Sequence, residues 1–169
     1  ETVAISVNPS INDLTDDNEP IPGYVGQPQG ILSDVVILPY NNLDVCVSKL
    51  REYKDSLACV IMEPVISSFG YTPLDLDFLA GIRNITKELG ILLVFDEVQS
   101  LRISSGGAQE YFGIVPDLTA MGKVIGGGLP VGAFGGREEI MSLYDQSEGK
   151  AVIPHSGTFN GNPMTLVAG

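Results

Sequence analysis

The sequence predicts an α/β fold, with a mostly parallel sheet and helices on both of its faces. Residues 57–62 and 91–95 are continuous apolar runs of strand length, and such runs are typical of parallel strands that are buried on both sides. A helical pattern separates them, and the alternation of strands with helices indicates this fold class. With 169 residues, of which 44% are hydrophobic, the chain has enough apolar material for one core.

The first part of the chain differs in composition from the rest. Residues 1–34 are rich in Asn, Asp, Pro, Gly and Gln, so we expect a loop-rich lead-in there and the folded domain over residues 35–169. Residues 35–38 predict a short strand that Pro39 stops. The apolar residues that follow recur at the spacing of one helix face, which predicts an amphipathic helix. These residues are Leu43, Cys46, Val47 and Leu50.

A second helix is expected between the two apolar strands. Thr72 and Pro73 suit the N-cap and first position of a helix, and Gly90 suits its C-terminal stop. After residues 91–95 we expect a loop that runs to Gly107. The remaining expected elements are a short helix over 108–112, strands over 117–121 and 131–135, a helix over 137–144 and a final helix over 163–168. Because the sequence stops as this last helix opens, we expect a piece of a larger protein.

Composition argues against several classes of function. The net charge is −12 and there is no basic run, so binding to nucleic acid or to anionic lipid is not expected. No apolar stretch approaches the roughly 18 residues needed to cross a bilayer. The two cysteines, Cys46 and Cys59, both lie in apolar segments. We therefore expect reduced core thiols in a cytoplasmic protein.

Two residues that follow predicted strands are candidates for ligand binding. Asp96 comes directly after the run 91–95, at the carboxyl edge where open α/β sheets place ligands. An Asp at such a position also caps turns, so both interpretations stay open. Lys123 lies among glycines and apolar residues, and desolvation of an ammonium group favours the neutral nucleophile that a Schiff base needs. A surface lysine in a glycine-rich hairpin is the alternative.

A third segment, residues 155–163, carries small hydroxyl residues and glycines before a helix start. It suits a bound phosphate, and it is equally typical of ordinary turn and N-cap chemistry. His155 is the only histidine, and we do not predict it as a catalytic base. Taken together, Asp96, Lys123 and a loop with Thr158 match the equipment of a pyridoxal phosphate site. There an acid pairs with the ring nitrogen, a lysine forms the imine and hydroxyl groups hold the phosphate.

These segments resemble the class III aminotransferases, which are pyridoxal-phosphate enzymes of fold type I. The resemblance runs from about residue 34 to the end of the chain and consists of six blocks in the family's order. The blocks are residues 61–65 (IMEPV), 93–99 (LVFDEVQ), 116–119 (PDLT), 122–128 (GKVIGGG), 132–137 (GAFGGR) and 157–159 (GTF). Their number and order make the resemblance specific, and it implies part of the large cofactor-binding domain.

The resemblance also implies a cofactor, pyridoxal 5′-phosphate, and a role for each matching residue. Lys123 would be the Schiff-base lysine, and Asp96 the partner of the pyridine nitrogen. Val98 would pack on one face of the ring, and Gln99 would lie near its phenolic oxygen. Thr158 would reach the phosphate of the neighbouring subunit's cofactor, which implies a homodimer with shared active sites. No metal ligand is expected.

Two subgroups of the family are similar to this sequence. Residues 106–109 (GGAQ) and 161–163 (GNP) resemble the glutamate-1-semialdehyde 2,1-aminomutases. The short segment 96–109 and residues 155–160 (HSGTFN) resemble aminotransferases that act on β-amino acids such as β-phenylalanine. We favour an aminotransferase that moves an amino group between an amino acid and a keto acid, and keep the aminomutase as the alternative.

The sequence departs from the family in two places. Nothing matches the upstream Gly-Ser/Thr loop that cradles the phosphate, and nothing matches the C-terminal small domain. Glu63, within the first block, is expected close to the site as a support residue with no assigned role. An inactive fragment or scaffold remains the alternative from another class of protein.

Overall fold

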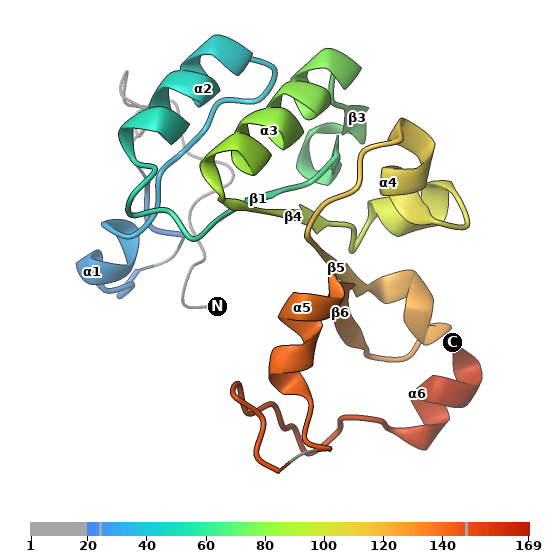
Figure 1. Cartoon of the computed structure of the whole chain (residues 1–169). Coiled ribbons are helices and arrows are strands. Elements are labelled where there is room, and N and C mark those ends of the chain that lie inside the picture. The colour runs from blue at the N-terminus through green and yellow to red at the C-terminus, as the bar shows by residue number, and fades with distance from the viewer. Residues whose placement is uncertain (1–19, 24, 148) are drawn as a thin grey trace.

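A four-stranded sheet organises the chain (Figure 1), and its strand order is β1-β4-β5-β6. The structure is a computed structural model that describes residues 20–23, 25–147 and 149–169. Neighbours β1, β4 and β5 run parallel, and β6 runs antiparallel to β5. A separate antiparallel hairpin pairs β2 with β3. The strands are β1 (Cys59–Met62), β2 (Val65–Ile66), β3 (Thr72–Pro73), β4 (Leu92–Asp96), β5 (Leu118–Gly122) and β6 (Gly132–Gly136).

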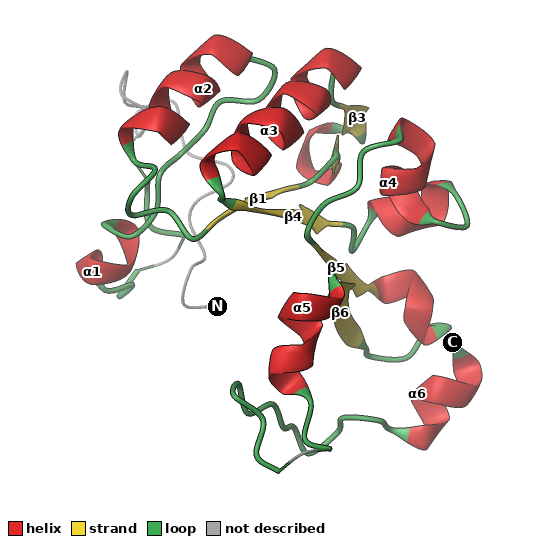
Figure 2. Ribbon diagram, viewed as in Figure 1, coloured by secondary structure: helices red, strands yellow, loops and turns green. Residues whose placement is uncertain are grey.

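Helices alternate with these strands, so the α/β class and the mostly parallel sheet are confirmed (Figure 2). The α-helices are α1 (Gln29–Leu32), α2 (Leu43–Glu52), α3 (Leu76–Leu89), α4 (Gly107–Phe112), α5 (Glu138–Met141) and α6 (Pro163–Ala168). Short 3₁₀ turns are η1 (Ser67–Phe69), η2 (Ser100–Ile103), η3 (Lys123–Gly126) and η4 (Ser142–Tyr144). None of the helices in the described ranges is both long and apolar enough to cross a membrane.

The core lies between the sheet and the pair α2 and α3, which run side by side over one face of β1 and β4 (Figure 1). Alternation along β4 directs Leu93 and Phe95 into this core, where neither is exposed. Burial of each such side chain stabilises the fold by about 1.5–3 kcal/mol. The other face of the sheet is less covered: Ile61 of β1 points to that face and is 65% exposed.

Several expected elements occur where the patterns predict them. The amphipathic helix is α2, and the two apolar runs contain β1 and β4. Gly90 ends α3 with a φ of 72°, a left-handed conformation that glycine adopts without steric cost. The expected helix over 137–144 divides into α5 and η4, and the expected loop before Gly107 contains η2. Most of the expected lead-in, residues 1–34, lies outside the described residues, and its described part contains α1.

Two expected elements are wrong. Residues 35–38 form no strand, because no described strand pairs with them, although Leu38 packs against the core. Thr72 and Pro73 do not start a helix but form β3, since their backbone pairs with β2. The helix α3 starts at Leu76, after Asp75 as its N-cap residue.

The expectation of two core thiols holds for one cysteine. Cys46 on α2 is buried, and burial raises the pKa of its thiol to about 11. Cys59 is free and exposed at the start of β1. The apolar run around Cys59 does not bury it, because it points to the less covered face of the sheet.

Candidate active site

Three ionisable residues stand at the carboxyl edge of the parallel strands. Glu63 follows β1, Asp96 ends β4 and Lys123 follows β5 directly. Asp96 pairs in register with Ala120 of β5, three residues before Lys123. The backbone at these positions therefore comes to one edge of the sheet, which is where open α/β sheets place their ligands.

The carboxylate of Asp96 has two different oxygens. Oδ1 accepts a hydrogen bond from the backbone N–H of Val98 at 3.0 Å. Oδ2 has no hydrogen-bond partner among the described residues, and the side chain is half-buried. Asp96 therefore caps its own turn, as one interpretation of the sequence predicts, and still has one oxygen available for a ligand.

Val98 connects this turn to the backbone in front of Lys123. A Cβ built on Gly122 would lie 3.5 Å from each of the two methyl groups of Val98 and 3.4 Å from the carbonyl oxygen of Val131. Gly122 is buried. The turn after β4 and the turn after β5 thus pack against each other, with no side chain between them at position 122.

Lys123 begins η3 in a left-handed conformation, with a φ of 48°. Such a φ costs a non-glycine residue about 1–3 kcal/mol and is concentrated at functional sites. The side chain is exposed and forms no ion pair or hydrogen bond within the described part of the chain. The expected desolvation of this lysine is therefore not found in the chain by itself, and its amine is free to meet a ligand at the carboxyl edge.

Gln99 and Thr158 lie in other surroundings. Gln99 is half-buried and lines an apolar cavity of about 310 Å³ between the β2–β3 hairpin and the segment η2–α4. Thr158 is exposed in the turn before α6. Among the described residues, no hydrogen bond joins Thr158 to Asp96 or Lys123.

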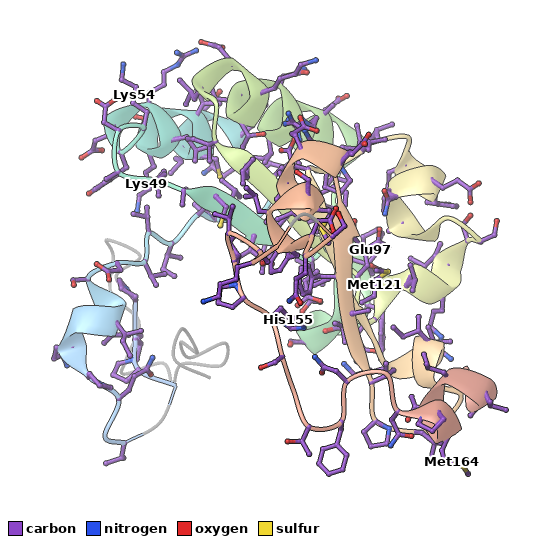
Figure 3. The ribbon with its side chains drawn as sticks, turned by 60° about the horizontal axis from the view of Figure 1, so that its bottom comes forward. Lys49, Lys54, Glu97, Met121, His155 and Met164 are labelled. Carbon is purple, nitrogen blue, oxygen red and sulfur yellow. The ribbon has the colours of Figure 1, made fainter. Side chains whose placement is uncertain are left out.

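The turn that carries Thr158 is held by an aromatic cluster instead. The ring of His155 lies edge-on to Phe134 at 5.6 Å and to Tyr144 at 6.1 Å between centroids. Nε2 of His155 also lies 3.3 Å from Nδ2 of Asn160. Figure 3 labels His155, which comes from the long connection between η4 and α6. These contacts hold the ring of His155 against Phe134, Tyr144 and Asn160.

Sequence reasoning missed two residues next to the site. Tyr40 has a raised pKa, because burial disfavours its phenolate and the carboxylates of Glu63 and Asp96 add a smaller effect. Glu97 is fully buried directly after Asp96. Nothing in the sequence near Tyr40 indicates its position, whereas the pair Gly106-Gly107 could have indicated a turn that encloses a buried side chain.

The structure defines a class of protein. It is an α/β domain in which an acid, Asp96, and an amine, Lys123, stand at the carboxyl ends of neighbouring parallel strands. Residues 22–169 match the family described as aminotransferase class-III. The chain therefore belongs to the class III aminotransferase family.

Known proteins of two kinds are similar to this chain. A glutamate-1-semialdehyde 2,1-aminomutase of Thermodesulfovibrio yellowstonii is 47% identical over 151 residues, which are 88% of this chain and 34% of that protein. An omega-transaminase from Sphaerobacter thermophilus has a TM-score of 0.86 at 48% identity and covers 90% of this chain and 35% of its own.

Two further solved structures bear on the chemistry. A structure described as a transaminase with PLP bound has a TM-score of 0.84 at 37% identity, over 88% of this chain and 35% of its own. A β-phenylalanine aminotransferase from Variovorax paradoxus has a TM-score of 0.74 at 41% identity, over 79% of this chain and 30% of its own. The likeness confirms that the chain has the fold of the matching part of these fold-type I transaminases. The chain spans about a third of the length of these relatives.

Proposed function

We propose that this chain forms part of the cofactor-binding domain of a pyridoxal-phosphate-dependent aminotransferase, which moves an amino group between an amino acid and a keto acid. The observation that carries the proposal is the position of Asp96 and Lys123 at the same edge of the sheet, which follows from the Asp96–Ala120 register. Membership of the class III family and the similar transaminase with PLP bound support the cofactor.

The described residues fit this cofactor. Among the described residues, Asp96 has an oxygen without a partner and Lys123 an amine without a partner, and Val98 lies against the backbone at Gly122, directly before the lysine. When bound, pyridoxal phosphate supplies an aldehyde and a ring that takes up electrons. Lys123 would hold the aldehyde carbon, Asp96 the ring nitrogen and Val98 one face of the ring.

Each of these residues would have a defined role in the transfer of the amino group. A carboxylate beside a protonated ring nitrogen favours the charged pair, so Asp96 would keep that nitrogen protonated. Lys123, once displaced by the amino donor, would remove the proton from the donor carbon and return it at the C4′ atom of the cofactor, first as general base and then as general acid. Gln99 would lie at the phenolic oxygen of the ring.

We further propose a homodimer with shared active sites. In its own chain Thr158 is exposed and has no hydrogen bond to Asp96 or Lys123 within the described ranges. This supports a role at the phosphate of the neighbouring subunit's cofactor. The proposed location is the cytoplasm.

For the substrate we propose an amino acid, with a β-amino acid as the first choice. The similarity to a β-phenylalanine aminotransferase and to an omega-transaminase supports this choice. The 47% identity to an aminomutase supports the second candidate, in which the amino group returns to a neighbouring carbon of the same molecule. A domain that has lost catalysis and serves as a scaffold is the third.

Titration of the full-length protein with pyridoxal phosphate, followed by amine-transfer assays, tests the proposal. A saturable visible absorption band is expected, together with transfer from β-phenylalanine to a keto acid. Conversion of glutamate-1-semialdehyde without a keto acid would select the aminomutase. A protein that develops no band would contradict the cofactor and favour the scaffold.

A further inference from the structure

We infer that Glu97 is a positioning residue, which fixes the turn 96–99 against the strand that leads to Lys123. Through this turn it holds Asp96 and Val98 in place. The inference rests on the proposed function and adds to it a residue that has no part in the chemistry described above.

The surroundings of the Glu97 carboxylate consist of hydrogen-bond donors. Oε2 accepts the backbone N–H of Ala108 at 2.5 Å and the hydroxyl of Ser100 at 3.3 Å. Oε1 accepts the backbone N–H and the side-chain Nε2 of Gln109, both at 3.2 Å. The side chain has no exposed surface, and no arginine or lysine pairs with it in the described part of the chain.

A buried carboxylate without a cation is costly unless donors surround it. Here the donors include the first backbone N–H groups of α4, which have no partner within the helix. Gly107 lets this turn approach, because it has a φ of 75° and a Cβ there would lie 2.6 Å from Oε2 of Glu97. The carboxylate therefore fixes α4 on the end of β4.

Glu97 and its partner Gln109 also form hydrogen bonds with the neighbouring strand, β5. The backbone N–H of Glu97 donates to the carbonyl oxygen of Ala120 at 2.9 Å. Nε2 of Gln109 donates to the hydroxyl of Thr119 at 3.1 Å in addition to Glu97. Figure 3 shows Glu97 beside β5, on which Met121 is labelled. Glu97 thus joins the turn that carries Asp96 and Val98 to β5, the strand that Lys123 directly follows.

Asp117 supplies a matched control, because it is also a buried carboxylate but stands just before β5, at the opposite edge of the sheet. Its partners are Arg83, Arg137 and the backbone N–H of Leu93. Glu97→Gln and Asp117→Asn each remove one buried charge and keep the size of the side chain. A merely structural role predicts the same consequences for both variants.

The experiment compares these two variants in the full-length protein by three measurements. Thermal unfolding reports stability, the visible band reports the dissociation constant of pyridoxal phosphate, and hydrogen exchange without cofactor reports the amides of residues 96–99. We expect both variants to lower the melting temperature. Only Glu97→Gln should weaken pyridoxal phosphate binding, by about tenfold, and speed exchange in the turn.

The outcomes separate the two hypotheses. A band in the wild type with unchanged cofactor affinity in Glu97→Gln, or with equal loss in both variants, overturns the positioning role alone. No band in the wild type overturns the proposed function and this inference together. Should Glu97→Gln fail to fold, Gln109→Ala removes the side-chain amide that donates to Glu97 and to Thr119 of β5, and it keeps the backbone N–H groups that donate to the carboxylate. It is expected to weaken binding by about threefold, and unchanged binding again overturns the role.

Discussion

Carboxylates at the two edges of the sheet differ in how many partners they have within the chain. At the amino edge of β5, Asp117 accepts from Arg83 at 2.8 Å, from Arg137 at 2.9 Å and from the backbone N–H of Leu93 at 2.8 Å. At the carboxyl edge, Asp96 has an oxygen without a partner and Lys123 an amine without one, among the described residues. One edge is closed by internal pairs and stabilises the fold, whereas the other keeps groups available for a ligand.

Replacing the free amine has the largest expected effect. Lys123→Ala in the full-length protein should reduce turnover by about a thousandfold or more, because no other described residue offers an amine at this place to move the proton. The melting temperature should not fall, since the exposed side chain forms no hydrogen bond or ion pair with any described residue. Turnover near the wild-type level would mean that the open edge is not the site of catalysis.

Replacing Asp96, the acid at the same edge, has the second largest expected effect. Asp96→Asn keeps the hydrogen bond that Oδ1 accepts from Val98 but loses the charge. We expect cofactor to remain bound and turnover to fall by about a hundredfold, because the ring nitrogen would no longer be kept protonated. Steady-state rates and the absorption band measure the two effects separately. A variant with normal rates would remove Asp96 from the proposed site.

At the closed edge, the effect should appear in stability instead. Asp117→Asn leaves the guanidinium of Arg83, whose side chain is 17% exposed, without a charged partner, and we expect a loss of about 3 kcal/mol in the free energy of unfolding. Urea unfolding of the full-length protein measures this loss. A loss as small as that of an exposed ion pair, below about 1 kcal/mol, would contradict the picture of a closed edge.

Acid should weaken the closed edge in a defined direction. Burial raises the pKa of Asp117, but the hydrogen bonds from Leu93, Arg83 and Arg137 outweigh it, so the pKa lies below its ordinary value of 3.8. The stabilisation is therefore complete above that value and is lost as the pH falls through the lowered pKa. Unfolding measured from about pH 5 down to about pH 2 should show a shallower loss for Asp117→Asn than for the wild type. If stability fell equally steeply with pH in the two proteins, the lowered pKa of Asp117 would be contradicted.

The smallest predicted effect concerns the turn that encloses Glu97. Gly107→Ala should destabilise the protein by about 2 kcal/mol, because the new methyl group would meet the Glu97 carboxylate as well as strain the backbone. Gly113 is the control, since it has a similar φ of 67° with open space around it. Gly113→Ala should cost only the strain, about 1 kcal/mol. Equal losses would show that no close contact exists at Gly107.

Much of the fold follows from local patterns in the sequence. The continuous apolar runs around β1 and β4 and the helical spacing in α2 identify these elements, because burial alone determines them. The edge position of Asp96 and Lys123 also follows, since parallel strands end together. A Thr-Pro pair, however, suits both a helix start and a short edge strand. Only pairing with β2 decides that Thr72 and Pro73 form β3.

The features that local sequence patterns do not predict depend on contacts between distant segments. Residues 35–38 are apolar enough for a strand but have no described strand beside them. Glu97 looks like an exposed neighbour of Asp96 in the sequence, and its burial arises from Gly107 and Gln109, which fold back over it. Such closure depends on the left-handed turn at Gly107, and the sequence pattern does not specify which side chain that turn encloses.

One measurement tests the central claim most directly: borohydride reduction of the full-length protein with pyridoxal phosphate, followed by mass spectrometry of its peptides. We predict a single modified residue, Lys123, and no modification of that peptide in Lys123→Ala. A reduced cofactor found on another lysine, or on none, would contradict the assignment of this edge as the active site.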